Sequence, residues 1–211
     1  MSLYDKTLNE YLEVASSSSP TPGGGSVSAV VATSAAAMVC MVANLTIGKK
    51  GYEDCWDAAK AILEDAKKCI DSLKELTAKD MEAFETYMAA FRLPKDTEEQ
   101  KKARKEAIQK EAKNATIIPL SIAKVCHTIL VLAEKLSHFG NKGAISDVGV
   151  AAYIADGALR AAMFSVDINL PTIEDEAFVK EVTQERCCLF ATAEELKEKT
   201  VVKVRERMAG H

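Results

Sequence analysis

Apolar residues recur along most of this chain at spacings of three and four, which is the pattern of helices that bury one face. The longest run covers about residues 54–91 and places one stripe along a single helix face: Ala59, Leu63, Ala66, Ile70, Leu73, Thr77, Asp80, Phe84, Tyr87 and Phe91. At about 1.5 Å per residue this helix is about 57 Å long, so it must pack against other long helices.

Helices of the same kind account for most of the remaining chain. A short amphipathic helix is expected at 4–15, a buried small-residue helix at 26–47 and a second small-residue helix at 146–163. Thr97 and Gln100 form a capping box that opens a helix ending near 139, with Pro119 permitting a kink. No convincing β-sheet or internal repeat is present, so the pattern predicts an all-α antiparallel bundle of long helices.

The last part of the chain is predicted to contain a link and one more helix. Residues 166–170 are expected to be a short extended link. Thr172 and Asp175 then suggest another capping box, which would open the final helix. We expect residues 1–211 to form a single domain, since this length can bury one substantial core.

A proline- and glycine-rich turn leads directly into the first buried helix. Its residues are Pro20, Thr21, Pro22, Gly23, Gly24, Gly25 and Ser26, and the run that follows, 27–45, carries no charge. If that run is helical, the glycines and Ser26 lie at a helix N-terminus, whose free N–H groups suit an anion or a polar ligand oxygen. The alternative is a flexible linker, because four serines, 16–19, precede the turn.

The charge-free stretch 15–47 is long enough for a membrane span, which must therefore be considered. It is rich in alanine, is interrupted by Ser28, Thr33, Ser34 and Asn44, and lacks a basic segment and a cleavage signature. Small residues on all sides suit a helix inside a bundle, where neighbouring backbones approach closely. The sequence therefore favours a core helix without a membrane.

Composition narrows the classes of function. Hydrophobic residues make up 48%, charged residues 27%, and the net charge of −4 weakens any nucleic-acid interpretation. Six cysteines form no C-x-x-C pair, and His127, His138 and His211 have no ligand-like spacing, so we predict no metal site. Reduced thiols in a cytoplasmic protein are the expected state of the cysteines.

Two aspartates stand out as candidates for chemistry. Asp80 falls on the core stripe, where a carboxylate must be paired, protonated or beside a wet cavity. The alternative role for it is a polar register or salt-bridge residue. Asp147 and Ser146 begin the second small-residue helix, where the helix dipole favours a carboxylate, and simple capping is the alternative there.

Several segments together resemble the cyclodeaminase/cyclohydrolase family, which contains the C-terminal domain of formimidoyltransferase-cyclodeaminase and free-standing bacterial enzymes. They occur in the family's order over nearly the whole chain: residues 20–26, 45–49, 80–84 with 90–94, Gly140-Asn141 and Ser146-Asp147. Ser165 is a departure, because an asparagine is usual in the family at this place. The formimidoyltransferase part has no counterpart, so the resemblance points to the free-standing members.

The resemblance implies substrates that are tetrahydrofolates with a one-carbon unit between N5 and N10, and it implies no metal or redox cofactor. It implies a homodimer with active sites near the subunit interface. Asp80 and Asp147 become the candidates for proton transfer, and one of them, or Asn141, would bind the pterin's N–H edge. The expected substrate-binding residues are Gly23, Gly24, Gly25, Ser26, Asn141 and Ser146, with Lys49, Arg92 and Lys142 for the glutamate carboxylates.

Two reactions fit this resemblance. A cyclodeaminase closes 5-formimidoyltetrahydrofolate to 5,10-methenyltetrahydrofolate and releases ammonia, whereas a cyclohydrolase opens the methenyl compound to 10-formyltetrahydrofolate. We favour the cyclodeaminase here, because the motif set is best known from it. An alternative of another class is a non-catalytic helical adaptor, in which Asp80 fixes the register and the glycines form a hinge.

Overall fold

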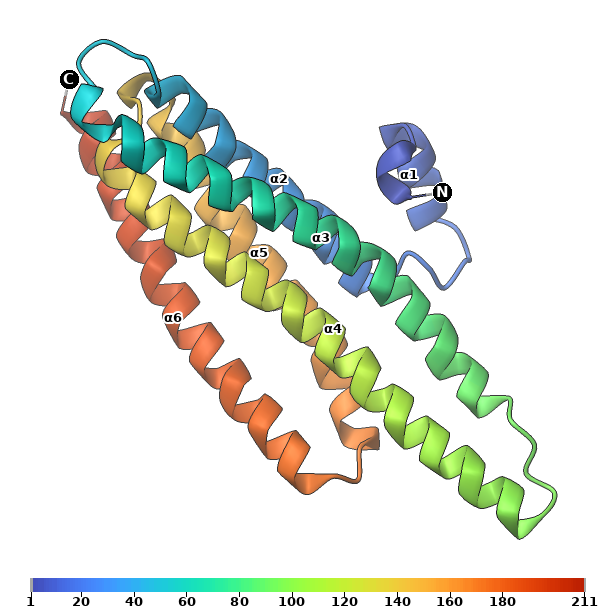
Figure 1. Cartoon of the computed structure of the whole chain (residues 1–211). Coiled ribbons are helices and arrows are strands. Elements are labelled where there is room, and N and C mark those ends of the chain that lie inside the picture. Colours follow the sequence, from blue (N-terminus) through green and yellow to red (C-terminus); the bar gives the residue numbers. More distant parts are fainter. Residues whose placement is uncertain (1, 211) are drawn as a thin grey trace.

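The computed structural model describes residues 2–210 as a bundle of long helices (Figure 1). Its α-helices are α1 Leu8–Ala15, α2 Gly24–Thr46, α3 Trp56–Phe91, α4 Glu98–Phe139, α5 Ile145–Asn169 and α6 Glu176–Ala209. Short 3₁₀ turns lie at Leu3–Asp5, Glu53–Cys55, Lys142–Ala144 and Leu170–Thr172, and residues 2–210 contain no strand. The predicted all-α antiparallel bundle is confirmed.

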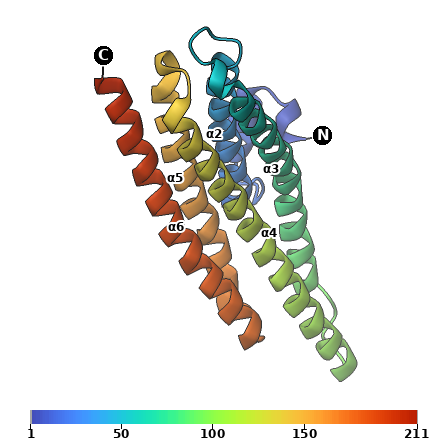
Figure 2. The ribbon, with the colours of Figure 1, turned by 60° about the vertical axis from the view of Figure 1, so that its left-hand side comes forward.

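Four helices form the central bundle. Helix α2 packs on α3 and α5, and α4 packs on the same two helices, so α2 and α4 lie diagonally opposite. Helix α6 covers the groove between α4 and α5, and α1 lies apart, beside α2 (Figures 1 and 2). Each connection reverses the chain direction, which places the N-terminus of α2 beside the C-terminal part of α5.

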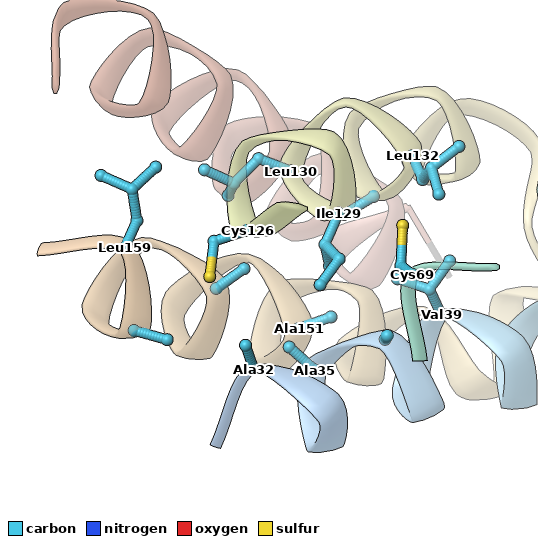
Figure 3. Close-up of a cluster of buried hydrophobic side chains, with 14 of the residues drawn as sticks. Ala32, Ala35, Val39, Cys69, Cys126, Ile129, Leu130, Leu132, Ala151 and Leu159 are labelled. Carbon is cyan, nitrogen blue, oxygen red and sulfur yellow. The ribbon is translucent and has the colours of Figure 1, made fainter. Parts of the chain in front are cut away.

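Small side chains let α2 and α5 approach closely in the core. Ala32 and Ala35 of α2 and Ala151 of α5 are fully buried, with Ile129 of α4 packed above them (Figure 3). Cys126 of α4 and Cys69 of α3 also lie in this core, and burial raises the pKa of Cys69 to about 11. These thiols therefore serve as small apolar side chains.

The helix ends follow the expected local signals in several places. Thr97 and Gln100 form the capping box that opens α4, and Gln100 N–H donates to the Thr97 hydroxyl at 3.2 Å. Gly48 and Gly51 adopt φ of 75° and 87° in the turn after α2, a backbone region that favours glycine. Helix α1 is amphipathic but buries none of its residues.

The prediction for residues 166–175 was wrong. Helix α5 continues to Asn169, because Val166 remains on the buried face, and a 3₁₀ turn containing Pro171 follows. Asp175, rather than Thr172, caps α6, accepting a hydrogen bond from the Phe178 N–H at 3.1 Å. β-branched residues favour extended structure, but burial of Val166 in the core keeps this stretch helical, although Ile168 is exposed.

Helices α2 and α4 are long and apolar enough to cross a membrane by length and composition alone. The core helix of a bundle passes the same test. Within their most apolar windows, 56% of α2 and 50% of α4 is buried against the other helices. In this structure, burial in the bundle accounts for about half of each apolar window.

Candidate active site

A cavity of about 390 Å³ lies beside the N-terminus of α2, where the glycine turn meets α3, α4 and α5. Gly23 is the N-cap of α2 and has no side chain to satisfy the first N–H groups of the helix. Gly24 and Gly25 line the cavity as the first helical residues, so the predicted helix start is confirmed. A volume of this size suits one small organic ligand.

Asp80 of α3 also lines this cavity and reaches the first turn of α2. The Ser26 hydroxyl donates to Asp80 Oδ2 at 2.6 Å. A Cβ on Gly25 would overlap the Asp80 carboxylate, so only glycine permits this contact. Asp80, a residue of α3, therefore accepts a hydrogen bond from the first turn of α2.

Burial raises the pKa of Asp80 above its ordinary value, while hydrogen bonds from the Ser26 hydroxyl and backbone N–H lower it by a smaller amount. A carboxyl group that is easier to protonate and still reaches a cavity is a candidate for general acid or base chemistry. Asp80 forms no ion pair within residues 2–210. The salt-bridge alternative for Asp80 therefore has no support.

The walls of the cavity are largely apolar and aromatic. Phe84, Tyr87 and Met88 extend along α3, and Ile168 faces them from α5. The Tyr87 hydroxyl lies 3.2 Å from the hydroxyl of Thr172. Flat walls with a few fixed polar groups suit a planar heterocycle.

A second, more open cavity of about 330 Å³ adjoins the first and shares Pro20, Phe84 and Met88 with it. Arg92 and Glu85 also line it. The structure thus places one of the three predicted cations in a cavity that adjoins the main one.

Lys49 and Asn141 lie together at the opposite end of α2. The Lys49 ammonium donates to Asn141 Oδ1 at 2.6 Å, and the buried Asn141 donates from its backbone N–H to Thr46 Oγ1 and from Nδ2 to the Leu45 carbonyl, both at 2.8 Å. Through these hydrogen bonds, the polar atoms of Asn141 stabilise the C-terminal end of α2.

Lys142, Ser146 and Asp147 lie at this same end. Lys142 hydrogen-bonds through its ammonium to the Gly210 carbonyl, and Ser146 and Asp147 occupy the first turn of α5. Ala144 is the N-cap of α5, so neither Ser146 nor Asp147 caps this helix.

The two groups of predicted site residues lie at opposite ends of α2, which is 23 residues long. At 1.5 Å per residue, this separates the two groups of predicted site residues by roughly 33 Å within one chain.

Several residues of the cavity were not predicted from the sequence, among them Tyr87, Met88, Ser165 and Asn169. Ser165 and Asn169 are four residues apart and share a helix face, a signal that was hidden when this stretch was expected to be extended. Within residues 2–210, no group of three His, Cys, Asp or Glu residues is arranged to hold a metal ion. His211 lies outside the described residues.

Comparisons with known proteins match this chain over nearly its whole length. Methenyltetrahydrofolate cyclohydrolase from Methylorubrum extorquens is 39% identical over 204 residues, covering 97% of this chain and 98% of that protein. The crystal structure of formiminotetrahydrofolate cyclodeaminase from Thermotoga maritima superposes with a TM-score of 0.88 at 33% identity, covering 97% of this chain and 98% of that one.

Longer relatives match through one part of their length. Formimidoyltransferase-cyclodeaminase from Gallus gallus is 34% identical over 182 residues, which is 86% of this chain but 34% of that protein. The chain thus spans about a third of the length of this relative. The family described as Formiminotransferase-cyclodeaminase matches residues 7–187. On this match and the end-to-end relatives, the chain belongs to the formiminotransferase-cyclodeaminase family.

Proposed function

We propose that this protein hydrolyses 5,10-methenyltetrahydrofolate to 10-formyltetrahydrofolate. The observation that carries the proposal is Asp80, a partly buried carboxyl with a raised pKa at the edge of an apolar cavity. The relative from Methylorubrum extorquens, matched over 98% of its length, bears the name of this activity. The cavity has room for a pterin between its aromatic and aliphatic walls.

Asp80 would act in both halves of the reaction. As a carboxylate it takes one proton from water while the water oxygen bonds to the methenyl carbon, giving a tetrahedral carbon. The bond from this carbon to N5 then breaks, and protonated Asp80 returns its proton to N5. The remaining hydroxyl proton passes to solvent as the formyl carbonyl forms on N10, so one proton is released per turnover. A positioned acid–base group of this kind contributes about 10²–10⁴-fold to the rate.

Cyclodeamination is the second candidate, supported by the name of the Thermotoga maritima structure and by the motif set. In that reaction N10 attacks the formimidoyl carbon on N5, and the amine is protonated and leaves as ammonia. Both reactions pass through a tetrahedral carbon between N5 and N10, so one cavity can serve either. The sequence favoured this activity, and we rank it second here because the cyclohydrolase relative, matched over 98% of its length, supports the other reaction.

Supplying each folate separately distinguishes the two reactions. We expect the protein to accelerate loss of the methenyl absorbance without release of ammonia. Formation of the methenyl compound and ammonia from 5-formimidoyltetrahydrofolate, without faster hydrolysis, would assign the cyclodeaminase instead. No conversion of either folate by well-folded protein would refute both and favour a binding role.

The adjoining cavity offers a place for the glutamate tail of the folate. A pterin held near Asp80 would direct the rest of the molecule past Phe84 and Met88 toward Arg92. Arg92 would then pair with a glutamate carboxylate. Lys49 and Lys142 cannot reach this position within the same chain, because they lie at the other end of α2.

We also propose that two copies of the chain associate through the exposed face of α2 and α5. Helix α2 has no charged residue, and the exposed stripe on α5 is also uncharged: Ser146, Val150, Tyr153, Gly157, Ala161, Phe164 and Ile168. Phe164 and Ile168 are 76% and 75% exposed, which is unusual for large apolar residues in one stripe.

Gly157, in the middle of this stripe, is a second argument that this face of α5 packs against another copy. A Cβ there would meet nothing within 4 Å, so packing inside the chain does not require glycine. In a helix interior, glycine costs about 1 kcal/mol relative to alanine. A helix of the second copy that packs closely against α5 at this position would explain why the residue is glycine.

The orientation of the two copies determines which residues meet. A two-fold axis lying in this face and perpendicular to the helices reverses one chain end for end. Gly24 and Ile168, at one end of the face, line the Asp80 cavity, and Ser146 lies at the other. Such a dimer would bring Lys49 and Asp147 of the partner near the cavity, uniting the two groups of predicted residues.

A further inference from the structure

Pro119 interrupts the backbone hydrogen bonds of α4 beside the cavity. In an α-helix the carbonyl of each residue accepts from the N–H four residues later, and proline has no N–H. Pro119 is buried inside α4, so the Ala115 carbonyl lacks its usual partner. Ala115 lines the main cavity, where a carbonyl without a partner would be costly.

Asn169, the last residue of α5, satisfies this carbonyl. Its Nδ2 donates to the Ala115 carbonyl at 3.0 Å and to the Ser165 carbonyl, also at 3.0 Å. Both partners are carbonyl oxygens, which only accept, so the amide nitrogen must face them. The orientation of the Asn169 side chain is therefore fixed by its surroundings, and both of its N–H groups are used.

The oxygen of this amide remains available. Within residues 2–210, Asn169 Oδ1 accepts no hydrogen bond, and it is not among the side-chain atoms that are buried without a partner. Asn169 lines the same cavity as Asp80. Asn169, a residue of the cavity wall, thus has an unused acceptor, and its amide is held in one direction by two backbone carbonyls of different helices.

We propose that Asn169 Oδ1 accepts a hydrogen bond from a ring N–H of the ligand, and that Pro119 positions it by freeing the Ala115 carbonyl. This inference rests on the proposed function, which supplies a reduced pterin as the ligand. The pterin ring carries several N–H groups. Phe84, Met88 and Ile168 offer them no acceptor, so acceptors come from the few polar residues of the cavity, among them Asp80 and Asn169. Asn169 therefore selects a heterocycle that presents a donor at this position.

A purely structural role for Asn169 makes a different prediction. If it only ends α5, its loss should lower thermal stability and leave ligand affinity of the folded protein unchanged. If it binds the ligand, Asn169→Leu should raise the Kd for tetrahydrofolate and the KM for 5,10-methenyltetrahydrofolate by about tenfold or more. We expect a smaller change in kcat, because this hydrogen bond would be made in the substrate complex and in the transition state alike.

Pro119→Ala tests the positioning step without touching the ligand. The new N–H at residue 119 can donate to the Ala115 carbonyl and compete with Asn169, while alanine favours the helix. We expect unchanged or higher thermal stability together with weaker tetrahydrofolate binding, by a smaller factor than for Asn169→Leu. Asn114→Ala, an exposed asparagine on α4 next to Ala115, is the matched control and should leave affinity and turnover unchanged.

The experiment uses the full chain, with calorimetric binding of tetrahydrofolate, KM and kcat for the methenyl substrate, and thermal unfolding. A folded Asn169→Leu protein that binds tetrahydrofolate like the wild type overturns the assignment of the acceptor. Wild-type affinity in Pro119→Ala overturns the positioning role, and this variant decides the proposal if Asn169→Leu fails to fold. Wild-type protein that neither binds nor converts either folate overturns the proposed function itself, and the pterin assignment with it.

Discussion

Gly25 and Asp80 lie in such close contact that a Cβ on Gly25 would overlap the Asp80 carboxylate. The glycine belongs to the first turn of α2 and the aspartate to the C-terminal half of α3, 55 residues later along the chain. The next residue, Ser26, is fully buried and donates its hydroxyl to the same carboxylate. The glycine turn and the misplaced acid, two separate features of the sequence, are therefore parts of one site.

Gly25→Ala is expected to displace the Asp80 carboxylate and reduce turnover by at least about tenfold, since a small misplacement of an acid–base group is costly. Gly24→Ala provides the comparison. A Cβ there meets only the Ser165 hydroxyl, at 3.7 Å, which is an ordinary contact. We expect a clearly smaller loss in steady-state turnover for Gly24→Ala. Equal losses in the two variants would contradict the special position of Gly25.

Asp80→Asn should cut turnover at least tenfold while leaving the helical content intact, because an amide cannot carry the proton. Its oxygen can still accept from Ser26, so the start of α2 remains satisfied. Turnover of the methenyl substrate and far-ultraviolet circular dichroism provide the two measurements. Full turnover in Asp80→Asn would end the catalytic assignment and leave Asp80 with a structural role only.

The raised pKa of Asp80 predicts a pH dependence of stability with a definite sign. The folded state retains this proton at pH values where the unfolded chain has lost it. The stabilisation is therefore fully present below about pH 3.9, the ordinary value for aspartate, and is lost as pH rises through the raised pKa. Asp80→Asn lacks this dependence. Denaturant unfolding at several pH values should show wild-type stability falling relative to Asp80→Asn as pH increases, and the opposite trend would refute the shift.

The proposed dimer should sediment at twice the monomer mass of 22.8 kDa at micromolar concentration. Phe164→Glu places a charge in the exposed stripe of α5 and should shift the protein toward the monomer, because an unpaired buried charge is costly. Gly157→Phe should do the same by preventing close approach. Val202→Glu, at an exposed position on α6, is the control and should leave the mass unchanged. A wild-type protein that sediments only as the monomer would rule out this assembly.

Arg92→Ala should weaken binding of folates that carry several glutamates more than binding of tetrahydrofolate with one glutamate. The reason is that Arg92 lines the cavity adjoining the main one, where we propose that the tail lies. Arg205→Ala, an exposed arginine on α6, is a control of equal charge change. Equal affinities of wild type and Arg92→Ala for every tail length, measured by calorimetry, would exclude Arg92 from the tail site.

The sequence by itself determined the helices, the glycine turn at the start of α2 and the anomalous position of Asp80. Apolar spacing and capping residues act over a few neighbours, so they identify which face of a helix is buried and where most helices begin. The same local reasoning failed at 166–170, predicted as a short extended link, a conformation that the β-branched Val166 and Ile168 also prefer. Burial of Val166 in the bundle overrode that preference.

Only the tertiary structure decided which helix ends meet. A periodic pattern contains no information on the partner of a helix end, so Asp80 and Asp147 were both candidates for one site, although α2 separates them within the chain. The structure brings Asp80 to Ser26 and places Asn169 in the same cavity, where the missing N–H of Pro119 leaves a carbonyl for it. The Ser26–Asp80 and Asn169–Ala115 contacts each join residues 54 positions apart, so long-range packing of the bundle, rather than local preference, sets their geometry.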